Sequence, residues 1–366
     1  MADRAWLWVA VLFVLVSTGG VAGPLEDVLR LTPVLFESPF IAFTYWARIR
    51  ADEGLDDLTS QSPIEERWAL VRSTTERHAA PSAFGSSRLA VHAGVWGWDV
   101  ADHVWEACLV LDALPPLWLV HVGPGVDLDA LAARFRDRGF TREDLSGVAV
   151  FHHPLDLTAD WLRATELAIL NTAILFGERL LVMCSAPGGV EAVLAARAGE
   201  LASWAEVPWA ASLAQVLDRA SGAVLLLGPA TCLSFSAADV LATLIASPPN
   251  EAARRFKALL EAGPPLHPYV GFAAGYEVED GEPVGLFVLH YLDGESARAD
   301  LSARTALAEE GVSLVTRVLY REGTFTVRAA SVEGTSVVLR VDPTNGQPSR
   351  VFSMVHARDL TFALCP

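Results

Sequence analysis

Lysine is almost absent from this sequence: Lys257 is the only one, and arginine supplies the rest of the positive charge. Acidic residues number 44 against 27 basic ones, so the formal net charge is −17. A folded surface with this excess of negative charge repels nucleic-acid phosphates and anionic lipid headgroups. We therefore expect no nucleic-acid partner, and contact with a membrane only through an N-terminal segment.

Motifs that hold a nucleotide phosphate are missing. No Gly-x-x-x-x-Gly-Lys-Ser/Thr segment occurs, and Gly123-Pro124-Gly125 begins a Gly-x-Gly-x-x-Gly pattern in which Leu128 replaces the third glycine. Asp127 stands at the expected N-cap of the following helix, where a carboxylate accepts the free N–H groups and repels a phosphate. We expect Asp127 to cap a helix, and we expect no cofactor.

Motifs of nucleophilic and metal-dependent catalysis are missing as well. The chain has no Gly-x-Ser-x-Gly, no Ser-x-x-Lys, no His-Glu-x-x-His and no calcium-binding loop. His152 and His153 are adjacent, with Asp156 nearby, but neighbouring side chains on a strand point to opposite faces and do not easily share an ion. These absences favour a non-catalytic protein without a metal, although distant residues could still assemble an active site.

Cysteine is scarce, and each cysteine lies in an apolar segment. An even number of cysteines permits one or two disulfides in an oxidising compartment, and the sequence does not choose among the pairings. Buried, reduced thiols are the alternative. The four residues are Cys108, Cys184, Cys232 and Cys365.

Only one long apolar run is present, and it lies at the N-terminus. Arg4 is followed by an uncharged stretch over residues 5–16 and by small residues up to Gly23. This pattern predicts a signal peptide over residues 1–22 that is cleaved after Ala22, with an uncleaved membrane anchor as the alternative. In both cases the rest of the chain is expected outside the cytoplasm, either secreted or anchored to the cell membrane.

The remaining sequence alternates between helical and strand patterns. A capping box at Ser62 predicts a helix that begins at Pro63. Further helices are expected at 39–54, 127–139, 188–199, 211–220, 236–246, 250–263 and 295–311. Strands are expected at 88–100, 104–114, 117–122, 147–153, 223–228, 285–292, 323–330, 335–341 and 351–357, with a hairpin over 173–185 and an Asn345-Gly346 turn before the last strand.

This mixture predicts an α+β fold, with mixed or antiparallel sheets and helices packed on one face. We expect two lobes, over residues 23–222 and 223–366. Segments 117–140 and 285–312 share a plan of apolar strand, acidic turn and helix, and this favours a weak internal repeat. The alternative is that any strand–turn–helix unit looks alike.

Acidic and aromatic residues gather between residues 96 and 106. Tryptophan faces beside carboxylates are what a carbohydrate site offers, and two carboxylates can serve as acid and base. The opposing interpretation is a turn whose tryptophans pack into the core. The candidate ligand-binding residues are Trp96, Trp98, Asp99, Asp102, Trp105 and Glu106.

The sequence as a whole favours an exported or membrane-tethered, non-catalytic, bacterial-type cell-envelope protein with a binding or structural role, whose partner is a small ligand or another envelope protein. The alternative is a secreted hydrolase that acts on glycans through the acidic and aromatic cluster at residues 96–106.

Overall fold

The structure of the chain is a computed structural model. It describes residues 23–34, 39–74, 77, 79, 89–111, 114–145, 147–153, 171–185, 187–228, 230–233, 235–236, 240, 251–346 and 349–366. The predicted export segment at 1–22, and most of the predicted helix at 236–246, lie outside these residues. Within them, no helix is both long enough and apolar enough to cross a membrane.

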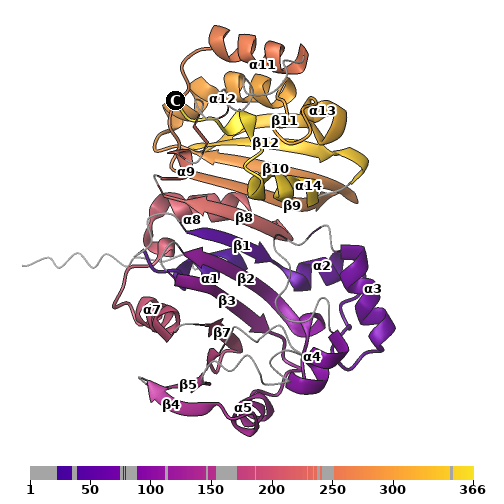
Figure 1. Ribbon diagram of the computed structural model, residues 1–366, viewed down its shortest axis with the longest axis vertical. Coiled ribbons are helices and arrows are strands. Elements are labelled where there is room, and N and C mark those ends of the chain that lie inside the picture. Colours follow the sequence, from indigo (N-terminus) through magenta and orange to yellow (C-terminus); the bar gives the residue numbers. More distant parts are fainter. Residues whose placement is uncertain are drawn as a thin grey trace, which may run out of the picture.

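A single twelve-stranded sheet forms the centre of the molecule (Figure 1). Its order is β11-β12-β10-β9-β8-β1-β2-β3-β7-β6-β5-β4, and neighbouring strands pair antiparallel. The strands are β1 (Phe40–Thr44), β2 (His103–Leu111), β3 (Leu114–Val122), β4 (Thr141–Leu145), β5 (Val148–His152), β6 (Thr172–Leu175), β7 (Leu180–Cys184), β8 (Gly222–Leu227), β9 (Gly271–Glu279), β10 (Glu282–His290), β11 (Phe325–Glu333) and β12 (Ser336–Pro343).

Helices are divided between the two faces of this sheet. The larger helices are α1 (Pro24–Arg30), α2 (Trp46–Asp52), α3 (Ile64–Thr74), α4 (Leu89–Trp96), α5 (Leu128–Asp137), α7 (Pro187–Arg197), α8 (Pro208–Val216), α11 (Glu251–Ala262), α12 (Gly294–Glu309) and α14 (Ser349–His356), and the short ones are α9 (Ala230–Leu233) and α13 (Tyr320–Gly323). Helices α1, α7 and α8 share a core with one face, whereas α12 and α14 share a core with the other. The predicted α+β class with antiparallel pairing is confirmed, but the helices do not keep to one face.

Three segments differ from the sequence prediction. Residues 39–54 were expected to be one helix, yet they form strand β1 and then α2, because a short strand that is apolar on both sides cannot be told from a buried helix by periodicity. Residues 88–100 were expected to be a strand, but helix α4 occupies most of that range. Residues 351–357 were also expected to be a strand, but they form α14, whose apolar side chains at 351, 352, 354 and 355 follow helical spacing.

The start of α3 also differs in detail. The helix begins at Ile64, and the Ser62 hydroxyl accepts a hydrogen bond from the Thr59 N–H at 3.1 Å instead of completing the expected capping box. The hairpin expected over 173–185 is present as β6 and β7. The Asn345-Gly346 turn is also present, with positive φ at both residues, but it leads from β12 into helix α14.

The two halves of the chain follow the same order of elements. In each half a helix precedes a central strand, α1 before β1 and α8 before β8. Helices, a two-strand hairpin, a further helix and an edge strand come next, and the chain then returns toward the centre. Strand β8 lies at the predicted lobe boundary and pairs with both β1 and β9, so one sheet crosses that boundary. The two lobes and the sequence repeat stay predictions.

One disulfide ties the C-terminus to the second half. Cys232 in α9 bonds Cys365, 133 positions away, and both are buried. Cys108 and Cys184 take no part in this disulfide and are buried in the cores on opposite faces of the sheet. Disulfides form and persist in oxidising compartments, so this bond is compatible with a protein that works outside the cytoplasm.

A buried arginine also fixes the C-terminal segment. Arg304 in α12 is fully buried and donates hydrogen bonds to the carbonyl oxygens of Phe362 and Leu364. Its charge is balanced by Asp300, whose carboxylate also accepts from the Tyr291 hydroxyl at 2.9 Å. The guanidinium therefore satisfies carbonyl groups that are buried in and just after the short 3-10 helix η6 (Thr361–Ala363).

Asp127 caps helix α5 as the sequence predicts. Its carboxylate accepts hydrogen bonds from the N–H groups of Asp129 and Ala130, both at 3.0 Å. In the turn before it, the Arg179 guanidinium donates to the carbonyl oxygens of Gly123 and Pro124. The Gly-Pro-Gly turn is thus fixed by the chain's own side chains.

Replacing Asp127 with alanine should lower the free energy of unfolding by about 1 kcal/mol, because two helix N–H groups lose their acceptor. Urea denaturation followed by circular dichroism measures the change. Asp137→Ala is the matched control: this exposed acid lies at the C-terminal end of α5, where a negative charge opposes the helix dipole. If both variants lost equal stability, the carboxylate at residue 127 would not act as a cap.

Removing the disulfide with Cys232→Ala and Cys365→Ala together should cost about 2–4 kcal/mol, because the unfolded chain regains the freedom of a long loop. Denaturation with and without reductant provides the measurement. Reductant should bring the unmodified protein close to the double variant and leave the double variant unchanged. Cys108→Ala, which removes a thiol outside the bond, should keep the response to reductant.

Candidate functional site

The three predicted acids are engaged in structural bonds. Asp99 pairs with Arg67 and accepts from the Ala101 N–H, and Asp102 accepts from the backbone N–H groups of Asp99 and Ser60. Together Asp99 and Asp102 form a capping box around the short helix η2 (Val100–Asp102). Their carboxylates therefore stabilise the turn that leads into β2.

The third acid, Glu106, contacts a histidine. Its carboxylate lies 2.9 Å from Nδ1 of His103, and both side chains are buried. The carboxylates of Asp99, Asp102 and Glu106 are thus all removed from the surface, whereas a glycan-cleaving pair needs to reach a sugar.

The three predicted tryptophans do not form one surface. Trp96 and Trp98 belong to a core with Phe135 of α5, whereas Trp105 belongs to the core on the opposite face of the sheet. All three indoles are buried, as the opposing interpretation of the sequence expected. A ligand-binding role for the whole set stays a prediction, because the structure separates Trp105 from the other two tryptophans.

His92 completes the buried interior beside Trp98. The two rings meet edge to face with centroids 4.8 Å apart. Burial, together with the nearby His103, lowers the pKa of His92 to about 3. The imidazole is therefore neutral at pH 7 and resists protonation in the folded protein.

The adjacent histidines, His152 and His153, each contact a neighbouring side chain. Nδ1 of His152 lies 2.9 Å from the hydroxyl of Thr172, and the His153 ring packs against Phe140. Among the residues described, no group of three or more potential ligands is close enough to hold a metal ion. Asp156, the third member of the predicted set, lies outside the described residues.

Trp105 lines a cavity of about 460 Å³ beside α1 and α7, where its ring stacks on His121. The charged side chains around this cavity pair with one another. Arg30 pairs with Asp27, and Arg197 pairs with Glu178. A ligand that used either guanidinium would have to displace a carboxylate that is already in place.

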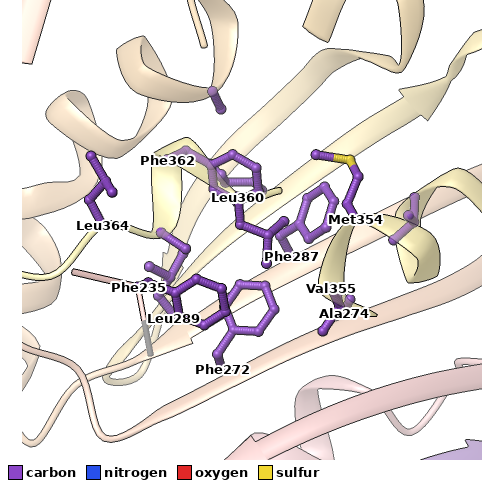
Figure 2. Packing of buried hydrophobic residues seen from close by; sticks show 14 of the residues in the cluster. Phe235, Phe272, Ala274, Phe287, Leu289, Met354, Val355, Leu360, Phe362 and Leu364 are labelled. Carbon is purple, nitrogen blue, oxygen red and sulfur yellow. The ribbon is translucent and has the colours of Figure 1, made fainter. Parts of the chain in front are cut away.

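A second cavity, of about 420 Å³, lies where the two halves of the sheet meet. We call it the central pocket. Its walls come from both halves of the chain, and Figure 2 shows Phe235 and Val355 in the same buried layer as Phe272 and Ala274. The lining consists of Pro39, Phe40, Val110, Leu226, Leu227, Ala230, Thr231, Phe235, Val355, His356 and Arg358.

Thr231 gives the central pocket an unsatisfied polar group. The residue is 2% exposed, and within the described part of the chain its Oγ1 atom is buried and has no hydrogen-bond partner. A buried hydroxyl without a partner typically costs about 1–3 kcal/mol, so nearly all such groups in folded proteins are bonded. Thr231 is one of the residues that line the cavity, although its Oγ1 atom itself exposes almost no surface.

Arg358 gives the pocket its positive charge, and its backbone is strained. It follows α14 with φ of 53°, and the N–H groups of Arg358 and Asp359 donate to the carbonyl oxygens of Val355 and Met354. These two bonds define a Schellman motif in which Arg358 occupies the left-handed position that glycine normally fills. A non-glycine residue kept in this conformation beside a cavity suggests a functional constraint.

The central pocket combines apolar walls with a few polar groups. Rings of Phe40 and His356 lie 5.3 Å apart, and Nε2 of His356 donates to the carbonyl oxygen of Ala79 at 3.0 Å. Arg358 is the one formally charged side chain among the described lining residues. Such a pocket can hold an apolar body and orient it through a polar end.

Sequence reasoning missed every residue of this pocket. Thr231 and Arg358 stand 127 positions apart by their numbers, and neither belongs to a motif. The unmatched hydroxyl and the left-handed backbone are visible only in three dimensions. The one sequence signal for this pocket is an arginine that follows an apolar segment. The sequence pattern predicts a strand for that segment, residues 351–357, whereas the structure forms helix α14 there.

Comparison with known proteins adds little to these observations. No family model matches the chain, and no curated protein matches it. Two solved structures, crystal forms I and III of TP0453, align with it at 8% and 9% identity, with TM-scores of 0.37 and 0.39. The alignments cover 90% and 89% of this chain and 96% and 97% of those chains.

Thr231→Val should leave the free energy of unfolding unchanged or raise it by about 1 kcal/mol, because it removes a buried hydroxyl that lacks a partner. Thr361→Val is the matched control. Thr361 is equally buried, but its hydroxyl bonds the Tyr320 hydroxyl at 3.0 Å, so this variant should lose about 1 kcal/mol. Equal losses in urea denaturation would mean that both hydroxyls are satisfied.

Acid should destabilise the protein through His92. Its pKa is lower in the folded state than in the unfolded one, so the unfolded state binds the extra proton between about pH 6.5 and pH 3. The contribution is fully present above pH 6.5 and falls by up to about 1.4 kcal/mol per pH unit below it. His92→Gln should flatten the dependence of unfolding free energy on pH in this range, whatever its effect at pH 7. An unchanged slope would contradict the assignment.

Proposed function

We propose that this chain is an exported or membrane-tethered, non-catalytic protein of a bacterial-type cell envelope, and that it binds a small ligand in the central pocket. The observation that carries the proposal is the pocket itself. It is a cavity of about 420 Å³ where the two halves of the sheet meet, and its lining combines apolar side chains with Arg358 and with Thr231, whose buried hydroxyl has no partner in the described structure.

Location outside the cytoplasm is supported by the Cys232–Cys365 disulfide and by the N-terminal apolar run. Helix α1 begins at Pro24, directly after the predicted segment. An uncleaved segment would therefore hold the α1 face of the protein close to the membrane. The central pocket opens among helices on the other face, so tethering would leave it accessible.

Binding without catalysis is supported by the chemistry of the lining. Among the described lining residues the polar side chains are Thr231, His356 and Arg358. A hydroxyl nucleophile needs a base within hydrogen-bond distance, yet Oγ1 of Thr231 has no such partner there, and Nε2 of His356 is bonded to a backbone carbonyl. Arrangements of this kind orient a ligand without activating it.

Mass spectrometry of the protein isolated from its native cells tests the location. We expect it in the extracytoplasmic fraction, with Gly23 at its N-terminus if the signal is cut, or with the full N-terminal segment in the membrane fraction if it is retained. Non-reducing digestion should yield a Cys232–Cys365 linked peptide. A cytosolic protein that keeps residues 1–22 would contradict the proposal.

Blocking the pocket tests binding. The probes are 3-phenylpropionate, 3-phenylpropanol and 3-phenylpropylamine, which share one apolar body and differ in charge, and calorimetry measures their binding. We expect saturable binding of at least one probe to the unmodified protein, and loss of that binding in Val110→Trp, which fills the pocket mouth.

Val91→Trp is the matched control. Val91 is 44% exposed and Val110 is 43% exposed, but Val91 lies on α4 and does not line the pocket. This variant should bind the probes as the unmodified protein does. If no probe binds, or if both tryptophan variants behave alike, the central pocket is not a binding site for ligands of this kind.

A further inference from the structure

We infer that the ligand of the central pocket is a monocarboxylate with a compact apolar body, and that its carboxylate pairs with Arg358. This inference rests on the proposed function and specifies its ligand class. Three features support it: the charge of the pocket, the character of its walls, and the cost to stability of two of its polar residues, Thr231 and Arg358.

The charge of the pocket contrasts with the charge of the whole chain. The protein carries a net charge of −17, and most of its described arginines lie beside a carboxylate or a carbonyl. Arg358 is exposed and forms no ion pair with any residue of the described chain. The walls of the pocket contribute no described acid. An arginine so placed is available to a carboxylate, which its two-pronged donor geometry matches.

The walls of the pocket suit a compact apolar group. Phe40 and His356 present tilted rings on one side, and Phe235 and Val355 stand in the buried layer shown in Figure 2. A volume of about 420 Å³ is near the lower end of small-molecule sites, which span roughly 300–1,000 Å³. Val110 also lines the pocket and is 43% exposed, so it adds an apolar side chain beside the exposed His356 and Arg358.

Both polar residues are poor choices for stability alone. Glycine would relieve the backbone at Arg358, and valine would remove the unpaired hydroxyl at Thr231. Residues that break local rules of folding without a structural gain tend to mark functional sites. A ligand accounts for Arg358, because its carboxylate uses the guanidinium, and Thr231 lies in the wall of the same cavity.

The test compares 3-phenylpropionate with the isosteric neutral amide 3-phenylpropionamide by calorimetry, on four forms of the protein: unmodified, Arg358→Gln, Arg358→Gly and Thr231→Val. We expect the unmodified protein to prefer the carboxylate. Arg358→Gln should weaken carboxylate binding about 10- to 100-fold, which is the usual effect of losing a charge-assisted hydrogen bond, and leave amide binding unchanged. Thr231→Val should leave binding of both probes nearly unchanged, because the Oγ1 atom exposes almost no surface to the cavity.

Arg358→Gly separates a ligand-binding role from a structural one. A glycine relaxes the left-handed position, so this variant should unfold at a higher urea concentration while it loses carboxylate binding as Arg358→Gln does. If it is instead less stable than the unmodified protein, Arg358 holds the fold together, and the inference is wrong.

The remaining outcomes distinguish this inference from the proposed function. If both probes bind equally and Arg358→Gln changes neither, the pocket binds ligands but does not select a carboxylate, and only this inference fails. If decanoate binds and 3-phenylpropionate does not, the ligand is a carboxylate with an extended apolar chain, and the inference of a compact apolar body is wrong. If neither these probes nor decanoate binds to the unmodified protein, there is no binding for Val110→Trp to abolish. Both this inference and the proposed function then fail.

Discussion

The antiparallel pairing of β1 with β8 is the interaction on which the rest of the molecule depends. Residues Phe40 to Thr44 pair on one side with β8 and on the other with β2, so this short strand joins both halves into one sheet. Its alternate side chains enter the cores on both faces, Ile41 and Phe43 on one and Ala42 on the other. The hydrogen bonds of the central strands are satisfied only when the two halves come together.

The central pocket is a consequence of that junction. Phe40 begins β1 and Leu226 lies near the end of β8, and these two residues are paired in register and both line the cavity. The helical residues that line the cavity come from the short helix α9 and from the end of α14. Cys232 in α9 is bonded to Cys365, so the wall that carries Thr231 is fixed covalently to the C-terminal segment. Arg304 holds the same segment from the other side.

Charged side chains in the interior and at the central pocket differ in whether they form ion pairs. Three of the buried charged groups are matched by a partner of opposite charge: Arg67 by Asp99, Arg304 by Asp300, and Glu277 by Arg340 at 2.8 Å. The edge strand β4 is exposed along its length and carries charged side chains, which oppose pairing with another sheet. Arg358 differs from these arginines because it pairs with no carboxylate of the described chain.

The sequence by itself determined the α+β class, most strands, the helix cap at Asp127 and the limits that acidity sets on partners, because periodicity, capping and charge are local properties. It misassigned residues 39–44, 88–100 and 351–357, where burial on all sides erased the amphipathic pattern or where β-branched residues outweighed helical spacing. Only the tertiary structure decided the pairing of β1 with β8, the choice of Cys232 and Cys365, and the burial of the cluster at residues 96–106. The central pocket also belongs to this second group, since its lining converges from segments that share no local pattern and its two unusual residues differ from others only in what surrounds them.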